Sequence, residues 1–248
     1  MSKEPRKHRV LFVHNDDPAA PLSSFFLHDI DILRKRYEVE VLSLYPYGHG
    51  HMDALASIRV WNAVLQSDAV FGWFGSSAPV VIMASLLRKP SIVIAGGIDV
   101  VYLPEIDYGL NPRRAIPYCL YRFGYRLARK VLLFSESSHR DYLKLPGIRS
   151  DRAATLYLGV DTDHFKPLGE KKQHVLTITY ISESGLRRKG IMTFLEAARQ
   201  TPDISYRIAG MVQDQDVVRK IVAAAPFNVT FLGYLTDQQL LQEFQKAA

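Results

Sequence analysis

The sequence predicts an α/β fold in which two doubly wound, Rossmann-like parallel-sheet domains follow each other, the second incomplete. Three observations predict this. Short apolar runs rich in valine, isoleucine and leucine alternate with amphipathic stretches along the whole chain. The alternation pauses once, at a charged segment near residue 169, and then restarts. The chain has 248 residues, more than one typical domain of about 100–200 residues.

Six apolar runs in the first part of the chain are interpreted as buried strands, because neither of their faces requires polar residues. They are RVLFVH (9–14), VEVLSL (39–44), AVFGWF (69–74), SIVIA (91–95), KVLLFS (130–135) and ATLYL (154–158). Residues 24–36 form a helix pattern with Phe26 and Ile30 on one face. Asp53 is expected to cap the next helix. Strands that alternate with helices imply right-handed crossovers and a parallel sheet covered on both faces.

The alternation restarts after GEKKQH (169–174), which is expected to be a linker. Thr236 and Gln239 predict a capping box for a last helix. The segments before that helix are HVLTITYI (174–181), GIMTFLEAARQ (190–200), ISYRIAG (204–210), DVVRKIVAAA (216–225) and NVTFLG (228–233). A doubly wound sheet usually has about five or six strands, so we expect the sequence to end part-way through its second domain. The predicted domains are residues 1–167 and 168–248.

The net charge of +6 and the pI near 9.3 fit an anionic partner, which could be nucleic acid, a membrane surface or a small molecule. No apolar run reaches the roughly 18–20 residues needed to span a bilayer. The start of the chain lacks the apolar core of a signal peptide. We therefore expect a cytoplasmic protein, either soluble or peripheral on the inner face of the membrane.

The cysteine and histidine content predicts no metal site. The single cysteine, Cys119, excludes an internal disulfide, and its aromatic helical surroundings predict a core position. His49 and His51 alternate but have no third ligand in view. His14 ends the first predicted strand and is expected to point into the cleft at the strand ends, with an ordinary turn residue as the alternative.

A basic segment follows the first predicted strand of the second domain. SESGLRRKG (182–190) places Arg187, Arg188 and Lys189 in front of Gly190 and the helix that begins there. A helix N-terminus carries a partial positive charge, so adjacent cations are repelled unless an anion lies between them. We expect these groups to bind a diphosphate. The spacing alone also allows a different interpretation, in which the segment is a solvated basic loop. Neither of the two common glycine-rich phosphate-binding motifs is present.

A second candidate site is IAGGIDVVYLPEIDYG (94–109), at the end of a predicted strand. Gly96 and Gly97 allow a tight turn and the close approach of a ligand. Asp99 and Glu105 supply acceptors for sugar hydroxyls or for a proton. An ordinary turn with solvated acids is the alternative.

A third candidate is the helix pattern over residues 111–130, where cations interleave with aromatic side chains. The residues are Arg113, Arg114, Arg122, Arg126, Arg129 and Lys130 with Tyr118, Tyr121, Phe123 and Tyr125. This mixture suits the headgroup layer of an anionic membrane and, in principle, stacking on nucleic-acid bases. Pro117 interrupts the pattern, and a core helix remains open. Membrane contact is the predicted surface role, and no nucleic-acid partner is expected.

LGVDTDHFKP (158–167) resembles the Gly-Val-Asp-x-x-x-Phe-x-Pro signature that joins the two domains of family 4 glycosyltransferases. The segments around it follow the order found in that family. They are FSESSHRDYL (134–143), Lys189-Gly190, LEAA (195–198), IAG (208–210) and TFLGYLTDQQL (230–240). The resemblance implies a GT-B fold, in which the C-terminal domain holds a nucleotide-sugar donor and the N-terminal domain holds the acceptor.

The resemblance also implies an activity: retaining transfer of a hexose from a nucleoside diphosphate sugar to a hydroxyl of a glycan, polysaccharide or glycolipid. The nucleotide sugar is then a substrate, and no cofactor or metal is implied. Lys189 is similar to the family lysine that contacts the donor diphosphate, with Arg187 or Arg188 in place of a partner arginine. Asp99 joins these three as a catalytic candidate, and the acceptor side comprises Gly96, Gly97, Asp99, Glu105 and His14.

Family members continue into a Glu-(any seven)-Glu segment that binds the donor sugar, and this sequence has none. Without the groups that orient the sugar, little activity is expected. Two alternatives therefore remain: a non-catalytic module that binds a nucleotide sugar or a membrane surface, and a nucleotide-sugar epimerase, for which no acid–base pair is evident.

Overall fold

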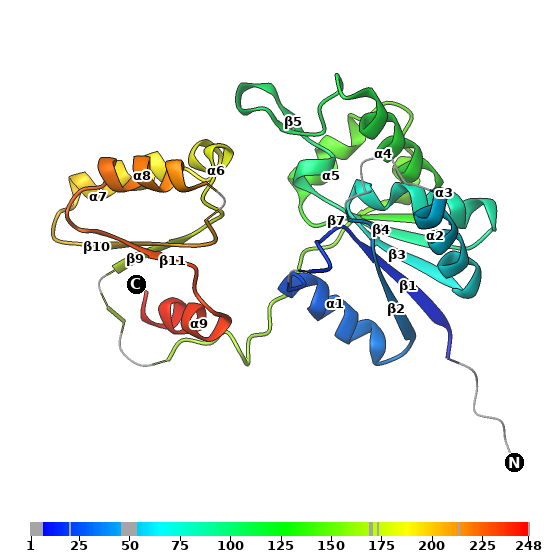
Figure 1. Ribbon diagram of the computed structural model, residues 1–248, viewed down its shortest axis with the longest axis horizontal. Coiled ribbons are helices and arrows are strands. Elements are labelled where there is room, and N and C mark those ends of the chain that lie inside the picture. Colours follow the sequence, from blue (N-terminus) through cyan, green and yellow to red (C-terminus); the bar gives the residue numbers. More distant parts are fainter. Residues whose placement is uncertain are drawn as a thin grey trace, which may run out of the picture. The chain divides into compact units, whose positions relative to one another are not determined.

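The computed structural model describes residues 7–19, 21–45, 54–168, 171–172, 174–212 and 214–247. The chain forms two compact units, Met1–Leu158 and Gly159–Ala248, and each contains a parallel sheet with helices (Figure 1). The predicted fold class is confirmed. The limit between the units falls at the start of LGVDTDHFKP, whereas the sequence prediction put it after that segment. Asp53, His49 and His51 lie outside the described residues.

The sheet of the first unit has six parallel strands in the order β2-β1-β3-β4-β7-β8. Each of the six predicted apolar runs overlaps one of these strands, and the central runs are buried because helices lie on the faces of the sheet. The prediction of burial is wrong at the edges: β2 is only partly buried, and ATLYL contributes Ala154 and Thr155 alone, with residues 156–158 exposed outside the strand. The strands are β1 Arg9–His14, β2 Glu38–Ser43, β3 Ala69–Trp73, β4 Ser91–Ala95, β7 Lys130–Leu133 and β8 Ala153–Thr155.

Helices cover both faces of this sheet (Figure 1). Side chains alternate along β1, so Leu11 packs with one hydrophobic cluster and Phe12 packs with Phe26 and Ile30 of α1 on the other face. The helices are α1 Ser24–Arg34, α2 Ala54–Gln66, α3 Ala78–Leu86, α4 Ala115–Leu127 and α5 Glu136–Leu143. The sequence analysis did not predict α3, because its sequence APVVIMASL has no polar face from which a helical period can be recognised.

Short elements connect the strands at the carboxyl edge of this sheet. A two-stranded antiparallel hairpin consists of β5 Tyr102–Leu103 and β6 Tyr108–Gly109, and the sequence analysis did not predict it. The 3₁₀ turns that follow β3 and β4 at this edge are η1 Gly75–Ser77, η2 Gly97–Asp99 and η3 Pro104–Ile106, and the last two carry the candidates Gly97, Asp99 and Glu105. A fourth turn, η4 Ser150–Arg152, precedes β8 at the opposite edge.

The second unit has a three-stranded parallel sheet in the order β11-β10-β9. Its strands are β9 His174–Ile178, β10 Ser205–Ala209 and β11 Val229–Gly233, and its helices are α6 Glu183–Arg188, α7 Ile191–Gln200, α8 Gln215–Ala224 and α9 Asp237–Lys246. Ile208 packs with Leu195 of α7 and Ile221 of α8 in one buried cluster. The capping box predicted at Thr236 and Gln239 is present. Within the described ranges, no helix is both long and apolar enough to cross a bilayer.

Two predictions about α4 are wrong. Cys119 is exposed rather than buried in the core, because the helix turns Tyr121 and Tyr125 inward instead. Pro117 does not interrupt the helix: α4 begins at Ala115, so the proline lies in the first turn, where a missing N–H costs no hydrogen bond.

Candidate functional site

The basic segment 182–190 is not a loop. Ser182 accepts a hydrogen bond from the backbone N–H of Gly185 (3.2 Å) and caps the start of α6, which ends at Arg188 with Lys189 as its C-cap. Arg187 and Arg188 therefore lie in the last turn of a helix, where the partial negative charge of its C-terminus favours cations. The premise of the sequence analysis, that these cations require an anion, is corrected: α6 already compensates for them in part.

Two glycines allow the sharp turn from α6 to α7, which we call the α6–α7 corner (residues 182–190). A side chain at Gly185 would lie 2.5 Å from the carbonyl oxygen of Tyr180, so only glycine fits against the preceding strand end. Gly190 adopts a left-handed conformation (φ +66°), ends the short helix and caps the start of α7. Leu186 anchors α6 in the hydrophobic cluster of the second unit. The next three side chains are left on the surface.

Arg187, Arg188 and Lys189 are all exposed, at the carboxyl end of β9 and next to the N-terminus of α7. The first turn of α7 contains no acidic residue. The first N–H groups of any helix have no partner within the helix and attract anions. Chemically, the corner can bind an anion such as a phosphate.

The acceptor-side candidate Asp99 is buried, with only 2% of its surface exposed. Its carboxylate accepts three hydrogen bonds: from the backbone N–H groups of Gly75 and Gly96 (both 2.8 Å) and from the hydroxyl of Tyr125 (2.6 Å). Burial raises the pKa of Asp99 to about 6, although the hydrogen bonds favour the ionised form. Asp99 thus ties together the ends of β3 and β4 and helix α4.

The glycines beside Asp99 meet protein atoms rather than open space. A side chain at Gly96 would lie 2.0 Å from the ring of Phe134, so the absence of a side chain serves packing. Gly97 has φ +61°, which glycine adopts without strain. Phe74, which precedes Gly75, has φ +62°, and such strain in a non-glycine residue occurs often near functional sites.

Glu105 lies in η3, at the tip of the β5–β6 hairpin, and is exposed. It makes no hydrogen bond or ion pair with another described residue. The nearby Asp107 has a left-handed conformation and lies 4.0 Å from Arg114. Glu105 and Asp99 therefore belong to one loop but not to one cluster: the first faces solvent and the second is internal.

His14 is buried (4% exposed) at the carboxyl end of β1. Its Nδ1 accepts a hydrogen bond from the backbone N–H of Asp16 (3.1 Å), so the proton of the neutral ring lies on Nε2. Burial lowers the pKa of His14, which keeps the ring neutral at pH 7 and makes it a hydrogen-bond donor. Strand β3 lies between β1 and β4, which separates His14 from Asp99.

The sequence analysis did not predict the roles of two further polar groups at this edge. Asn15 Oδ1 is buried without a hydrogen-bond partner among the described residues. Tyr125 is buried and supplies the hydroxyl that binds Asp99. No local pattern predicted either role, because Tyr125 stands 26 residues from its partner.

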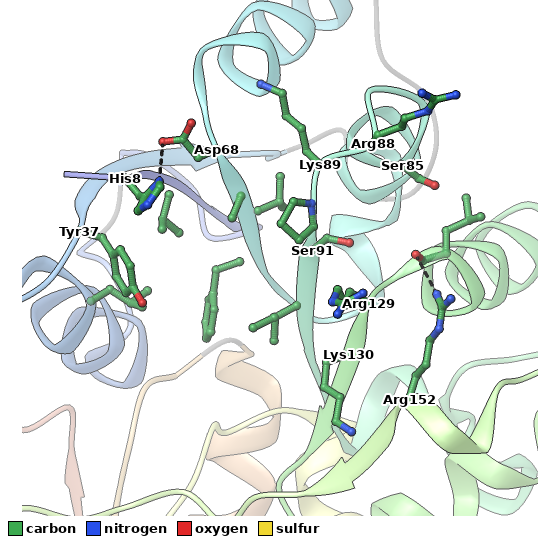
Figure 2. A pocket seen from close by; sticks show the side chains of 18 of the residues that line it. His8, Tyr37, Asp68, Ser85, Arg88, Lys89, Ser91, Arg129, Lys130 and Arg152 are labelled. Carbon is green, nitrogen blue, oxygen red and sulfur yellow. Dashed lines mark hydrogen bonds and ion pairs between the residues drawn. The ribbon is translucent and has the colours of Figure 1, made fainter. Parts of the chain in front are cut away.

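A hollow in the first unit lies at the opposite, amino-terminal edge of the sheet (Figure 2). Its volume is about 1410 Å³, and six Lys and Arg side chains against two aspartates make it basic. Lys89 donates to three carbonyls at the C-terminal end of α2, and Arg152 does the same for α4. These two cations cap helices. In parallel sheets ligands bind at the carboxyl ends of strands, so size alone does not make this hollow the site.

No family model matches the sequence, and no curated protein is significantly similar to it. Solved structures do match. The crystal structure of HepE from Anabaena in complex with UDP and glucose has a TM-score of 0.68 at 19% identity, covering 94% of this chain and 71% of that one. Sucrose-phosphate synthase from Thermosynechococcus elongatus has a TM-score of 0.66 at 14% identity, covering 97% and 74%. The fold of this chain is GT-B.

A UDP-forming α,α-trehalose-phosphate synthase from Burkholderia xenovorans matches in the same way, with a TM-score of 0.62 at 9% identity, covering 97% of this chain and 77% of that one. The likeness of these neighbours supports the GT-B fold class. At such identities the likeness concerns the fold, and residue roles have to be argued from this chain itself.

Proposed function

We propose that this protein is a retaining family 4 glycosyltransferase, which moves a hexose from a nucleoside diphosphate sugar to a hydroxyl of a glycan, polysaccharide or glycolipid. The observation that carries the proposal is the GT-B fold shared with HepE, whose structure contains UDP and glucose. The segments LGVDTDHFKP and Lys189-Gly190 support it, because they resemble the family in sequence.

The donor diphosphate is proposed to bind at the corner between α6 and α7. Lys189, Arg187 and Arg188 stabilise the negative charge that develops on the departing diphosphate, and the N-terminus of α7 adds its N–H groups. These residues act as electrostatic catalysts rather than as bases. Because α6 offsets part of their mutual repulsion, the cations are held together before the ligand arrives. The cations supply the positive charge that the leaving group needs, so the proposal includes no metal or cofactor.

The acceptor side is proposed at the carboxyl edge of the first sheet. His14 offers a neutral Nε2–H donor to an acceptor hydroxyl, and the exposed Glu105 offers an acceptor. Asp99 takes a positioning role in this proposal, because its buried carboxylate oxygens accept hydrogen bonds from the backbone N–H groups of Gly75 and Gly96 and so fix both loops. The proposed location is cytoplasmic, at the inner face of the membrane.

Titration of the purified protein with UDP and with GDP tests the donor site. We expect binding of a nucleoside diphosphate, weakened by at least about tenfold for each cation lost in R187Q/R188Q/K189Q. The matched control is K35Q/R36Q/R88Q, which removes three exposed cations from the first unit and should bind as the wild type does.

Different outcomes separate the alternatives. Nucleotide binding without transfer from any nucleotide sugar would favour a non-catalytic binding module, and interconversion of the sugar without transfer would indicate an epimerase. Absence of nucleotide binding together with salt-sensitive binding to DNA would overturn the proposal.

A further inference from the structure

Helix α4 has two faces of different character. Tyr121, Gly124 and Tyr125 are buried on its inner face. Gly124 packs so closely on Ala78 of α3 that a side chain there would lie 2.5 Å from the Ala78 Cβ. This contact and the bond from Tyr125 to Asp99 fix the rotation of the helix about its axis. The opposite face is therefore held outward.

The outer face carries an apolar stripe. Ile116 and Phe123 are 54% and 51% exposed, and Cys119 is exposed between them. Their spacing of three, four and seven residues places all three on one side of the helix. Large apolar side chains that gather on one exposed face commonly mark a binding surface.

Arg113, Arg114, Arg122 and Arg126 precede or interleave with this stripe in the sequence, and only Arg114 has an acidic partner among the described residues. Residues 111–130 contain no Asp or Glu. Arg113 and Arg126 are exposed and make no ion pair with another described residue. Arg114 lies 4.0 Å from Asp107, with both side chains about 70% exposed, which contributes little.

A shallow hollow of about 340 Å³ adjoins the stripe, lined by Cys119, Arg122, Phe123, Arg126, Pro146 and Gly147. The guanidinium of Arg122 donates to the carbonyl of Pro146 (2.9 Å) and lies 5.1 Å from the centre of the Tyr118 ring. These contacts hold Arg122 flat on the flank of the helix, where its charge still contributes to the local field.

We propose that the outer face of α4 docks on the surface of a lipid bilayer that contains anionic lipids. Phe123 and Ile116 enter the boundary between headgroups and acyl chains, and the arginines bind the headgroup phosphates. Nucleic acid fits less well, because stacking on successive bases needs several exposed aromatic rings, and of the four aromatic residues of α4 only Phe123 is exposed, while Tyr118 is half-buried and Tyr121 and Tyr125 are buried. The docking surface does not depend on the proposed transferase activity.

Co-sedimentation with vesicles tests the proposal. The protein should bind vesicles of equal parts phosphatidylcholine and phosphatidylglycerol, bind pure phosphatidylcholine weakly, and lose affinity as salt rises. The variant R113Q/R126Q should bind the anionic vesicles about 25-fold more weakly, at about fivefold per arginine. Phe123→Ser should also weaken binding, by about tenfold, because the exposed half of the Phe123 side chain is no longer available to enter the boundary between headgroups and acyl chains.

The control R36Q/R88Q removes the same charge from exposed positions outside α4 and should bind as the wild type does. If the control and R113Q/R126Q weaken binding equally, only net charge matters and the proposal is wrong. The proposal is equally wrong if Phe123→Ser has no effect. Tighter binding of duplex DNA than of anionic vesicles would point to nucleic acid instead. Thermal unfolding of each variant checks that the fold is intact.

Cys119 gives a direct reading of docking, because it is the single cysteine of the sequence and is exposed on the stripe. An environment-sensitive fluorophore attached there should shift to the blue on addition of anionic vesicles. The same label at Ser150→Cys in a Cys119→Ser background should not shift. Equal shifts at both positions, or none at Cys119, would contradict docking through α4.

Discussion

Two corners of the molecule lie in equivalent places and use polar groups in opposite ways. The Asp99 corner, formed by Gly75, Gly96 and Asp99, follows the carboxyl ends of β3 and β4. The α6–α7 corner, residues 182–190, follows the carboxyl end of β9. In the first corner, the buried Asp99 carboxylate accepts hydrogen bonds from three groups of the protein. In the second, three cations are exposed.

This difference teaches that a polar residue at a strand end is not by itself a ligand group. A buried carboxylate with three internal hydrogen bonds is a structural element, and its loss should affect folding. Exposed cations that a helix terminus already favours cost the fold little, so they remain available to a ligand. Stability and binding should therefore respond in opposite ways at the two corners.

The largest expected effect is on stability at the Asp99 corner. Asp99→Ala leaves two backbone N–H groups and the Tyr125 hydroxyl without an acceptor, which should cost at least about 3 kcal/mol of the free energy of unfolding. Urea unfolding followed by tryptophan fluorescence measures this in the first unit, because Trp61 and Trp73 both lie there. Glu105→Ala, an exposed carboxylate of the same loop, is the control. Equal stability of the two variants would refute the internal role.

The next effect is a pH dependence of the same corner. Because the pKa of Asp99 rises from 3.8 to about 6 in the folded state, the folded protein binds this proton more tightly than the unfolded chain. The contribution of Asp99 to stability is therefore largest below about pH 4 and falls as pH rises to about 6, by about 2–3 kcal/mol.

Comparison of the wild type with Asp99→Asn isolates this term, because the amide does not titrate and His14 contributes equally to both proteins. The unfolding free energy of the wild type should decrease relative to that of the variant between these pH values. A difference that is constant with pH would mean that Asp99 keeps an ordinary pKa.

The smallest expected effect is at the α6–α7 corner. R187Q/R188Q/K189Q should change the free energy of unfolding by no more than about 0.5 kcal/mol, because all three side chains are exposed. Circular dichroism during urea unfolding measures it. The same variant is the one expected to lose nucleotide binding, so a large loss of stability would remove the contrast between the two corners and assign these cations to the fold.

The fold was largely predictable from the sequence, and the reason is visible in particular elements. A buried parallel strand such as β1 or β4 is a short apolar run bounded by polar residues. Such a run can be recognised without knowing its position in the sheet, because any strand covered on both faces needs apolar side chains on both sides. Helix α3 was missed because both of its faces are apolar, so its sequence shows no helical alternation of apolar and polar residues. Helix α6 was missed because its six residues depend on the cap at Ser182 and on the anchor Leu186, not on a pattern.

The candidate site was less predictable. The location of both corners followed from the rule that ligands bind at the carboxyl ends of parallel strands. The states of Asp99 and Cys119 did not follow, because each depends on how α4 is rotated, and that is set by the contact between Gly124 and Ala78. The sequence could identify the aromatic residues of α4 but not which of them are inside.

The amino-acid sequence alone determined the order of the sheet strands and of the amphipathic helices, the doubly wound class and the positions where loops leave the strand ends, because these depend on local hydrophobic patterns and caps. Only the tertiary structure decided which polar groups form hydrogen bonds inside the protein and which are exposed on its surface. That decision rests on contacts between residues far apart in the chain, such as Gly75, Asp99 and Tyr125, and no local pattern records them.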